Sequence, residues 1–341
     1  MTLHTPTPTP NPSPFVRFTR RIYHPLHFRK GYNFTLWFLF SFALLGFLLA
    51  RAQYMNVSAN YLPQAGPGEA YWFRQSYYRI GISIHLIAII PAGFLVLFQF
   101  IPYIRHTFRL FHRINGSIII LLLLVSNVGA LLIVRRAFGG TMATQSATGV
   151  LALATTLGSV LAYINIKSLQ IDQHRAWMLR TWFYAGSIIT TRLIMIIAVQ
   201  IISSIGSYYT AMSCAQIAGT RDDGDVSAYP ACVSDPGGYT AVHADFSSTA
   251  GIEEIAAGFE LTFGMALWMA MVMHAVGVEV YLRLTTAEGE RLREVSYERQ
   301  AERGMRRAGS EGLTADRLGD VEGWVPRGKG EVGEGGMKEG K

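Results

Sequence analysis

Polar side chains lie inside long apolar runs of the sequence, at spacings that could place them together. His85 and Gln99 are fourteen residues apart in one run, Glu260 and His274 are fourteen apart in another, and Arg192 lies deep in a third. Fourteen residues make almost four helical turns, so each pair would lie on one helix face, roughly 21 Å apart. Such groups are costly in an apolar environment without a partner or water, so they mark candidate sites.

The spacing predicts two polar layers with different chemistry. The outer layer contains His85, Arg192 and Glu260. The inner layer contains Gln99, His112, His174 and His274. The outer layer could pass a proton or a small solute. The inner layer could ligate one haem, with His274 as one axial ligand and His112 or His174 as the other. Because the outer layer has one histidine, two bis-histidine haems cannot be built.

A structural interpretation competes with each of these. His85 and His274 can be interhelical hydrogen bonders, and Asn127, at a similar depth in another run, can act in the same way. Arg192 can pair with Glu260, the carboxylate well inside an apolar run. His112 and His174 are each followed by arginine and can fix orientation at a membrane surface. We find neither a nucleophile with its base nor a complete metal site, so enzymatic activity stays open and is disfavoured.

The surrounding chain predicts a membrane protein. Half of the 341 residues are apolar and 16% are charged, with the charges between the apolar runs. A helix needs roughly 20 apolar residues to cross a bilayer. Six stretches qualify: about 33–50, 80–101, 116–134, 149–166, 181–204 and 255–281. The expected fold is an all-α polytopic bundle of six transmembrane helices.

The charge distribution predicts the orientation and the regions of the chain. If both termini are cytosolic, the cytosolic segments near the helix ends carry eleven lysines and arginines and the outer loops carry six. We expect a disordered Pro/Thr-rich basic leader (1–31), a membrane domain (32–283) and a charged, Gly-rich, mostly disordered tail (284–341), with disorder past Gly309. The basic segments suit anionic lipid headgroups and give no sign of nucleic-acid binding.

The last outer loop contains the two cysteines of the chain. Cys214 and Cys232 would lie in an oxidising compartment, which favours a disulfide over two free thiols. Asn56 begins a glycosylation sequon on the same side, but it lies within a few residues of the membrane, so its glycosylation stays open.

Several of these motifs resemble a known family. The segments are 81–85 (GISIH), 111–116 (FHRING), 136–140 (RAFGG), 174–180 (HRAWMLR) and 191–193 (TRL). Over about residues 78–205 they resemble the membrane proteins catalogued as domain of unknown function 2306. The resemblance implies a four-helix core module of bacterial and fungal proteins with no established activity, flanked here by the first and sixth helices. The leader and tail would suit a fungal member.

Three functions follow from these observations. The leading hypothesis is a structural or lipid-interacting membrane module whose polar residues hold the bundle together. The alternatives are a haem-binding electron-transfer module that uses the inner histidines and a proton or small-solute carrier that uses His85, Arg192 and Glu260.

Overall fold

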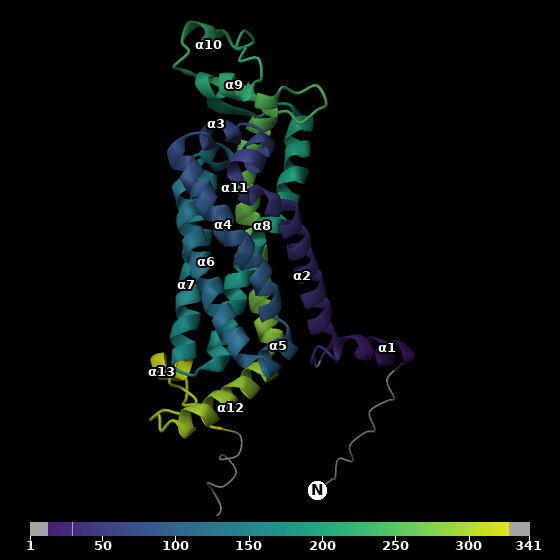
Figure 1. The fold of residues 1–341 in the computed structure, drawn as a ribbon, viewed down its shortest axis with the longest axis vertical. Helices are drawn as coiled ribbons and strands as arrows, with labels where there is room; N and C mark the ends of the chain where they lie inside the picture. Colours follow the sequence, from purple (N-terminus) through teal and green to yellow (C-terminus); the bar gives the residue numbers. More distant parts are fainter. Residues whose placement is uncertain (1–12, 29, 327–341) are drawn as a thin grey trace, which may run out of the picture. The chain divides into compact units, whose positions relative to one another are not determined.

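Long helices dominate the computed structural model, which describes residues 13–28 and 30–326. Within these residues, six helices are long and apolar enough to cross a membrane. They are α2 (Gly31–Ala52), α4 (Ser76–Gln99), α6 (Arg109–Ile133), α7 (Met142–Lys167), α8 (Ile171–Ile205) and α11 (Ile252–Leu284) (Figure 1). The predicted all-α polytopic fold is confirmed.

Most of these helices extend beyond the apolar runs that identify them. α7 begins seven residues before its apolar run because Thr141 caps it, accepting a hydrogen bond from the backbone N–H of Thr144 at 3.2 Å. At the start of α11, the backbone N–H of Gly251 donates to Glu254 Oε2 at 2.7 Å. Polar capping residues therefore decide where the helices start, and hydropathy does not detect them.

The chain divides into two compact units, and the first contains residues 84–126 and the described part of residues 1–56. It includes α1 (Pro14–Tyr23), α2, the short helix η1 (Gln53–Met55) and α5 (Pro102–Thr107). Helix α1 lies in the leader for which composition predicts disorder; the buried Tyr23 packs it on Phe34 of α2, a contact that composition does not show. The side chain of Leu48 in α2 packs against the backbone at Gly93 in α4. Asn115 Nδ2 in α6 donates to the carbonyl of Leu95 in α4 at 3.1 Å.

The second unit contains residues 57–83 and the described part of residues 127–341. Its short helical elements are η2 (Val57–Tyr61), η3 (Leu62–Gln64), α3 (Glu69–Phe73) and η4 (Ala137–Gly140). α7, α8 and α11 pack together around a buried cluster of Ala147, Met195, Phe263, Ala266, Leu267 and Met271. Helices α4 and α6 contribute residues to both units.

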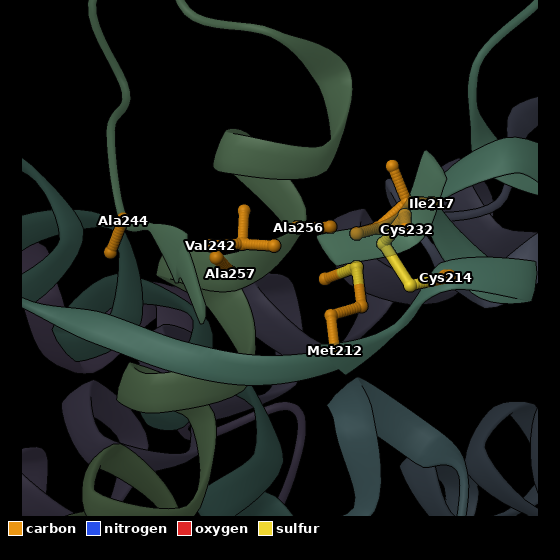
Figure 2. Close-up of a cluster of buried hydrophobic side chains, with 8 residues drawn as sticks. All are labelled: Met212, Cys214, Ile217, Cys232, Val242, Ala244, Ala256 and Ala257. Carbon is orange, nitrogen blue, oxygen red and sulfur yellow. A yellow bond between two sulfur atoms is a disulfide. The ribbon is translucent and has the colours of Figure 1, made fainter. Parts of the chain in front are cut away.

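A disulfide-linked subdomain lies between α8 and α11 in the sequence. Strands β1 (Tyr209–Ser213) and β2 (Tyr239–His243) pair in antiparallel fashion, and helices α9 (Cys214–Thr220) and α10 (Pro230–Ser234) connect them. Cys214 and Cys232 form a disulfide with a Cα–Cα distance of 5.2 Å, which confirms the predicted bridge. Figure 2 shows the two sulfur atoms in a buried cluster with Met212, Ile217, Val242, Ala244, Ala256 and Ala257. The last two belong to α11, so the bridge is part of the packing against this helix.

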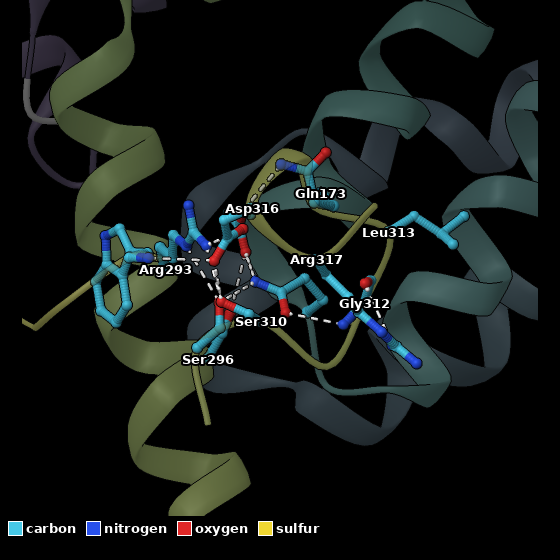
Figure 3. Close-up of polar contacts among 12 residues, drawn as sticks. Gln173, Arg293, Ser296, Ser310, Gly312, Leu313, Asp316 and Arg317 are labelled. Carbon is cyan, nitrogen blue, oxygen red and sulfur yellow. Dashed lines mark hydrogen bonds and ion pairs between the residues drawn. The ribbon is translucent and has the colours of Figure 1, made fainter. Parts of the chain in front are cut away.

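The chain after α11 forms two further helices, α12 (Thr286–Glu302) and α13 (Ala315–Leu318). Thr285 adopts φ −116° and ψ 30° at the end of α11, so α12 starts as a separate helix. Arg293 of α12 forms an ion pair with Asp316 of α13 at 2.7 Å, and Ser310 donates to the same carboxylate (Figure 3).

This C-terminal region also bonds to the turn between α7 and α8. The buried Asn165 accepts from the backbone N–H of Leu313 at 2.8 Å, and the buried Gln170 accepts from that of Gly312 at 3.1 Å. These bonds lie beyond Gly309, where the composition of the chain predicts disorder. The difference arises because amide side chains of α7 and of the α7–α8 turn accept hydrogen bonds from the backbone N–H groups of this region. Composition does not show these bonds. Residues 1–12 and 327–341 of the leader and tail lie outside the described residues.

Candidate functional site

Charged, polar and aromatic side chains from distant parts of the second unit meet in one largely buried group, which we call the acidic cluster. Its members are Glu69 of α3, Phe138 of η4, Arg192 of α8, Gln216 of α9, and Glu260 and Phe263 of α11. The outer-layer residues Arg192 and Glu260 both belong to it. Buried charges are costly unless paired, so the contacts of each member decide what the cluster can do.

Arg192 lies against two aromatic rings. Its guanidinium carbon is 4.6 Å from the ring centre of Phe138 and 5.2 Å from that of Phe263. The two rings stack on each other, with centres 4.1 Å apart and an angle of 13° between their planes. A cation within about 6 Å of an aromatic ring centre is attracted by the ring quadrupole, so this stack stabilises the arginine charge.

Glu69 supplies a negative charge that acts on Arg192. Its side chain is buried, and its carboxylate accepts hydrogen bonds from the backbone N–H of Phe138 at 3.3 Å and from the hydroxyl of Tyr61 at 3.5 Å. Burial raises the pKa of Glu69 above its ordinary value, and the Arg192 charge and these two hydrogen bonds oppose that rise.

Glu260 is the second buried carboxylate of the cluster. Its Oε1 accepts a hydrogen bond from Gln216 Nε2 at 2.9 Å, and its negative charge and that of Glu69 repel each other. Gly139 lies directly against the Glu260 carboxyl group and has a φ of 73°. A side chain at position 139 would be strained by the backbone and would overlap the carboxyl group, so glycine is required here.

The structure differs from the sequence-based expectation for Arg192. The expected partner was Glu260, whereas the carboxylate whose charge acts on Arg192 is Glu69, and Glu260 receives its hydrogen bond from Gln216. Glu69 was not considered because it precedes the second apolar run. α3 brings it to the backbone of Phe138, and therefore to the ring that Arg192 covers.

The histidine and amide side chains of the first unit bond to neighbouring helices. His85 Nδ1 lies 2.9 Å from the hydroxyl of Ser126 and 3.2 Å from its carbonyl oxygen. Gln99 Nε2 donates to the carbonyl oxygen of His112 at 3.2 Å, so these two inner-layer residues are in contact. These two contacts of His85 are with α6, and its place in the outer layer stays a prediction.

In the second unit, the polar residues that do not belong to the acidic cluster also form hydrogen bonds to neighbouring helices. Asn127 Nδ2 in α6 donates to the hydroxyls of Thr155 and Thr156 in α7, at 3.0 Å each. His174 Nδ1 in α8 lies 2.9 Å from the carbonyl oxygen of Ala162 in α7. Each of these bonds joins neighbouring helices.

His274, the preferred haem ligand, uses both ring nitrogens in contacts with α8. Nδ1 lies 2.7 Å from the carbonyl oxygen of Phe183, and Nε2 lies 2.8 Å from the hydroxyl of Thr190. Phe183 follows His174 by nine residues, which is about 14 Å along the helix axis. Two axial ligands of one iron must approach it from directly opposite sides, so this separation disfavours His174 as the partner of His274.

In the part of the chain that the structure describes, no group of three or more His, Cys, Asp or Glu side chains has the geometry to hold a metal ion. The acidic cluster has a different chemical capacity. Two carboxylates and one guanidinium carry one net negative charge when all are ionised, and a proton on either carboxylate would neutralise the group.

The fold and the acidic cluster together define the class of protein. This protein is a multi-pass integral membrane protein, with buried charge where helices α8 and α11 meet α3, η4 and α9. Residues 82–220 match the family described as "Predicted membrane protein (DUF2306)", which confirms the resemblance seen in the sequence motifs. That segment contains Phe138, Arg192 and Gln216 but neither of the buried carboxylates.

One curated relative comes from a fungus. The chain is 25% identical over 314 residues to "Ava biosynthesis cluster protein G" of Aspergillus versicolor, and the similarity covers 77% of this chain and 91% of the relative. No solved structure matches this protein.

Two polar residues of the cluster were missed at the sequence level, and one of them carried a usable signal. Glu69 is the first carboxylate in the chain, and the next is Asp172. A lone acid among so many basic and apolar residues is a reason to look for a buried cation. Gln216 carried no such signal, because it is one polar residue in a polar loop.

Proposed function

We propose that this protein is a structural, lipid-interacting membrane module in which intramembrane polar side chains join neighbouring helices. The observation that supports this proposal best is that polar residues singled out by their position bond to a second helix. These bonds are His85 to Ser126, Asn127 to Thr155 and Thr156, His174 to Ala162, and His274 to Phe183 and Thr190. Polar contacts of this kind are a common way of holding membrane helices together.

The proposal includes the topology inferred from the charge distribution. Residues 1–31 form a cytosolic leader, 32–283 the membrane domain and 284–341 a cytosolic C-terminal region, and basic residues at the cytosolic face contact anionic headgroups. A reporter fused after Lys341 should therefore be cytosolic, and one inserted at Gly224 should be on the outer side. A C-terminal reporter on the outer side would overturn this topology.

Replacing His274 separates a structural role from haem ligation. His274→Ala removes two interhelical hydrogen bonds and should lower the free energy of unfolding in detergent by about 0.6–2 kcal/mol, the range for such bonds in membranes. Haem-supplemented wild-type protein should show no low-spin Soret band. A sharp Soret band that is lost in His274→Ala, His112→Ala or His174→Ala would support the electron-transfer function and contradict the proposal.

A second candidate function is a proton or small-solute carrier that uses His85, Arg192 and Glu260. The observation in its favour is the pair of buried carboxylates, Glu69 and Glu260, beside one arginine, since such a site can take up and release a proton. The relative's name refers to a biosynthesis cluster, which would suit a small organic molecule as the solute.

Purified protein in liposomes that contain a pH-sensitive dye tests this second function. A carrier should dissipate an imposed pH gradient, and Glu260→Gln should abolish that activity because an amide cannot exchange the proton. Gradient decay equal to that of protein-free liposomes would exclude proton transport and leave the structural function.

A further inference from the structure

The N-terminal helix α1 has two chemically opposite faces. At 3.6 residues per turn, Phe15, Phe18 and Ile22 fall within roughly 60° of one another. All three are exposed, with 73%, 62% and 49% of their surfaces accessible. The arginines lie on the opposite side, at positions 17, 20 and 21, and are exposed as well. A short helix with one aromatic-aliphatic face and one basic face is typical of segments that lie in a membrane interface.

The contacts of Tyr23 hold α1 at the start of the first membrane helix. Its side chain is buried, and its ring stacks on Phe34 of α2 with centres 6.0 Å apart. It also lies against Gly31, where an added Cβ would be 3.5 Å from the ring. His27 adopts a φ of 63°, which turns the chain between the two helices. Figure 1 shows α1 running across the direction of α2 at the beginning of α2.

Charge identifies the partner of the basic face. The first 68 residues contain no Asp or Glu, so no carboxylate of this segment can neutralise the three arginines. A membrane helix begins at Gly31, and a bilayer that contains α2 has its headgroups next to α1. The phosphates of that leaflet match the arginines, and its acyl chains match the three apolar side chains.

We propose that α1 is a lipid-binding helix that lies in the plane of the leaflet at the N-terminal end of α2 and prefers anionic phospholipid. Phe15, Phe18 and Ile22 enter the acyl region, and Arg17, Arg20 and Arg21 bind headgroup phosphates. This inference deepens the proposed lipid-interacting function and rests on it.

Spin labels on the two faces test the proposal in the full-length protein. Cys214 and Cys232 are bridged, so a single added cysteine can be labelled without reductant. In phosphatidylcholine–phosphatidylserine vesicles, a label at Phe18→Cys should be accessible to oxygen dissolved in the lipid. A label at Arg20→Cys should be accessible to a water-soluble nickel complex.

The preference for anionic lipid is tested in the labelled Phe18→Cys protein. Near an anionic surface each arginine contributes about 1 kcal/mol, so Arg21→Gln should lower the ratio of lipid-inserted to water-exposed label about fivefold. Arg21→Lys keeps the positive charge at the same position and should leave the ratio unchanged. In vesicles of phosphatidylcholine alone, the labelled Phe18→Cys protein that keeps all three arginines should show a lower ratio than it shows in the anionic vesicles.

A label at Phe40→Cys, on the exposed surface of α2, separates failure of this inference from failure of the proposed function. If this label is in lipid while the Phe18→Cys and Arg20→Cys labels are equally water-accessible, α1 does not bind the leaflet. If both α1 labels are shielded from oxygen and from nickel, protein covers the helix and the proposal is also wrong. If the Phe40→Cys label is in water, the membrane insertion of α2 itself fails.

Discussion

Replacing each of the two buried carboxylates, alone and together with Arg192, should identify the one that attracts Arg192. Glu69→Gln removes the negative charge that acts on Arg192 but keeps an oxygen that can accept from the N–H of Phe138. Two opposite charges about 4 Å apart at an effective dielectric constant of about 20 attract each other by about 4 kcal/mol, and the attraction weakens as the distance grows. Glu69→Gln also removes the cost of burying that charge, which outweighs the attraction because the pKa of Glu69 is raised, so the single variant should be near neutral and the attraction should appear in the coupling to Arg192. Glu260→Gln keeps the acceptor for Gln216 and removes a charge that repels Glu69, so it should be near neutral or stabilising.

A double-mutant cycle measures the pairing directly. The free energy of unfolding would be determined in mild detergent for Glu69→Gln, Glu260→Gln, Arg192→Gln and the two double variants, with exposed Glu298→Gln as the control. The coupling energy between positions 69 and 192 should be about 2–3 kcal/mol, and that between 260 and 192 below about 0.5 kcal/mol. A larger coupling at position 260 than at position 69 would refute the assignment.

The pH dependence of the same cycle gives a second check. Burial raises the pKa of Glu69, so its folded form holds a proton to higher pH than its unfolded form, whose pKa is about 4.3. The stability that this raised pKa contributes is complete below about pH 4 and is lost as pH rises through the folded pKa. The coupling to Arg192 should grow over that same range, because only ionised Glu69 attracts the guanidinium. Coupling that is constant from pH 4 to 9 would contradict this reasoning.

Two further predictions concern the disulfide-linked subdomain. Reducing the bridge, or making Cys214→Ser with Cys232→Ser, should lower stability by about 3 kcal/mol, since the bridge closes a loop of 18 residues; an unchanged unfolding curve would contradict this. Hydrogen bonds from the hydroxyls of Ser203 and Ser247 lower the pKa of Asp245 to about 2. Its contribution is therefore complete above about pH 4 and is lost as pH falls toward 2, so the stability difference between wild type and Asp245→Asn should shrink over that range.

The helical membrane architecture could be read from the sequence because it depends on local properties. A run of about 20 apolar residues crosses hydrocarbon as a helix whatever its neighbours are, since the backbone must satisfy its own hydrogen bonds. The disulfide was predictable for a similar reason, because two cysteines in one outer loop have few alternatives. The family motifs were also visible in the sequence, and the structure explains one of them. Phe138 carries the ring beneath Arg192, and Gly139 makes room for Glu260.

Only the tertiary structure decided which charges meet. Glu69 lies outside every apolar run, and its interaction with Arg192, 123 residues further along the chain, depends on the folding of α3 against η4. The order of residues 310–326 was likewise decided by Asn165 and Gln170, whose amides accept the backbone N–H groups of Leu313 and Gly312. The cost of burying a polar group is local, but the partner that offsets it can come from anywhere in the chain. For this reason hydropathy locates the buried charge and packing selects its partner.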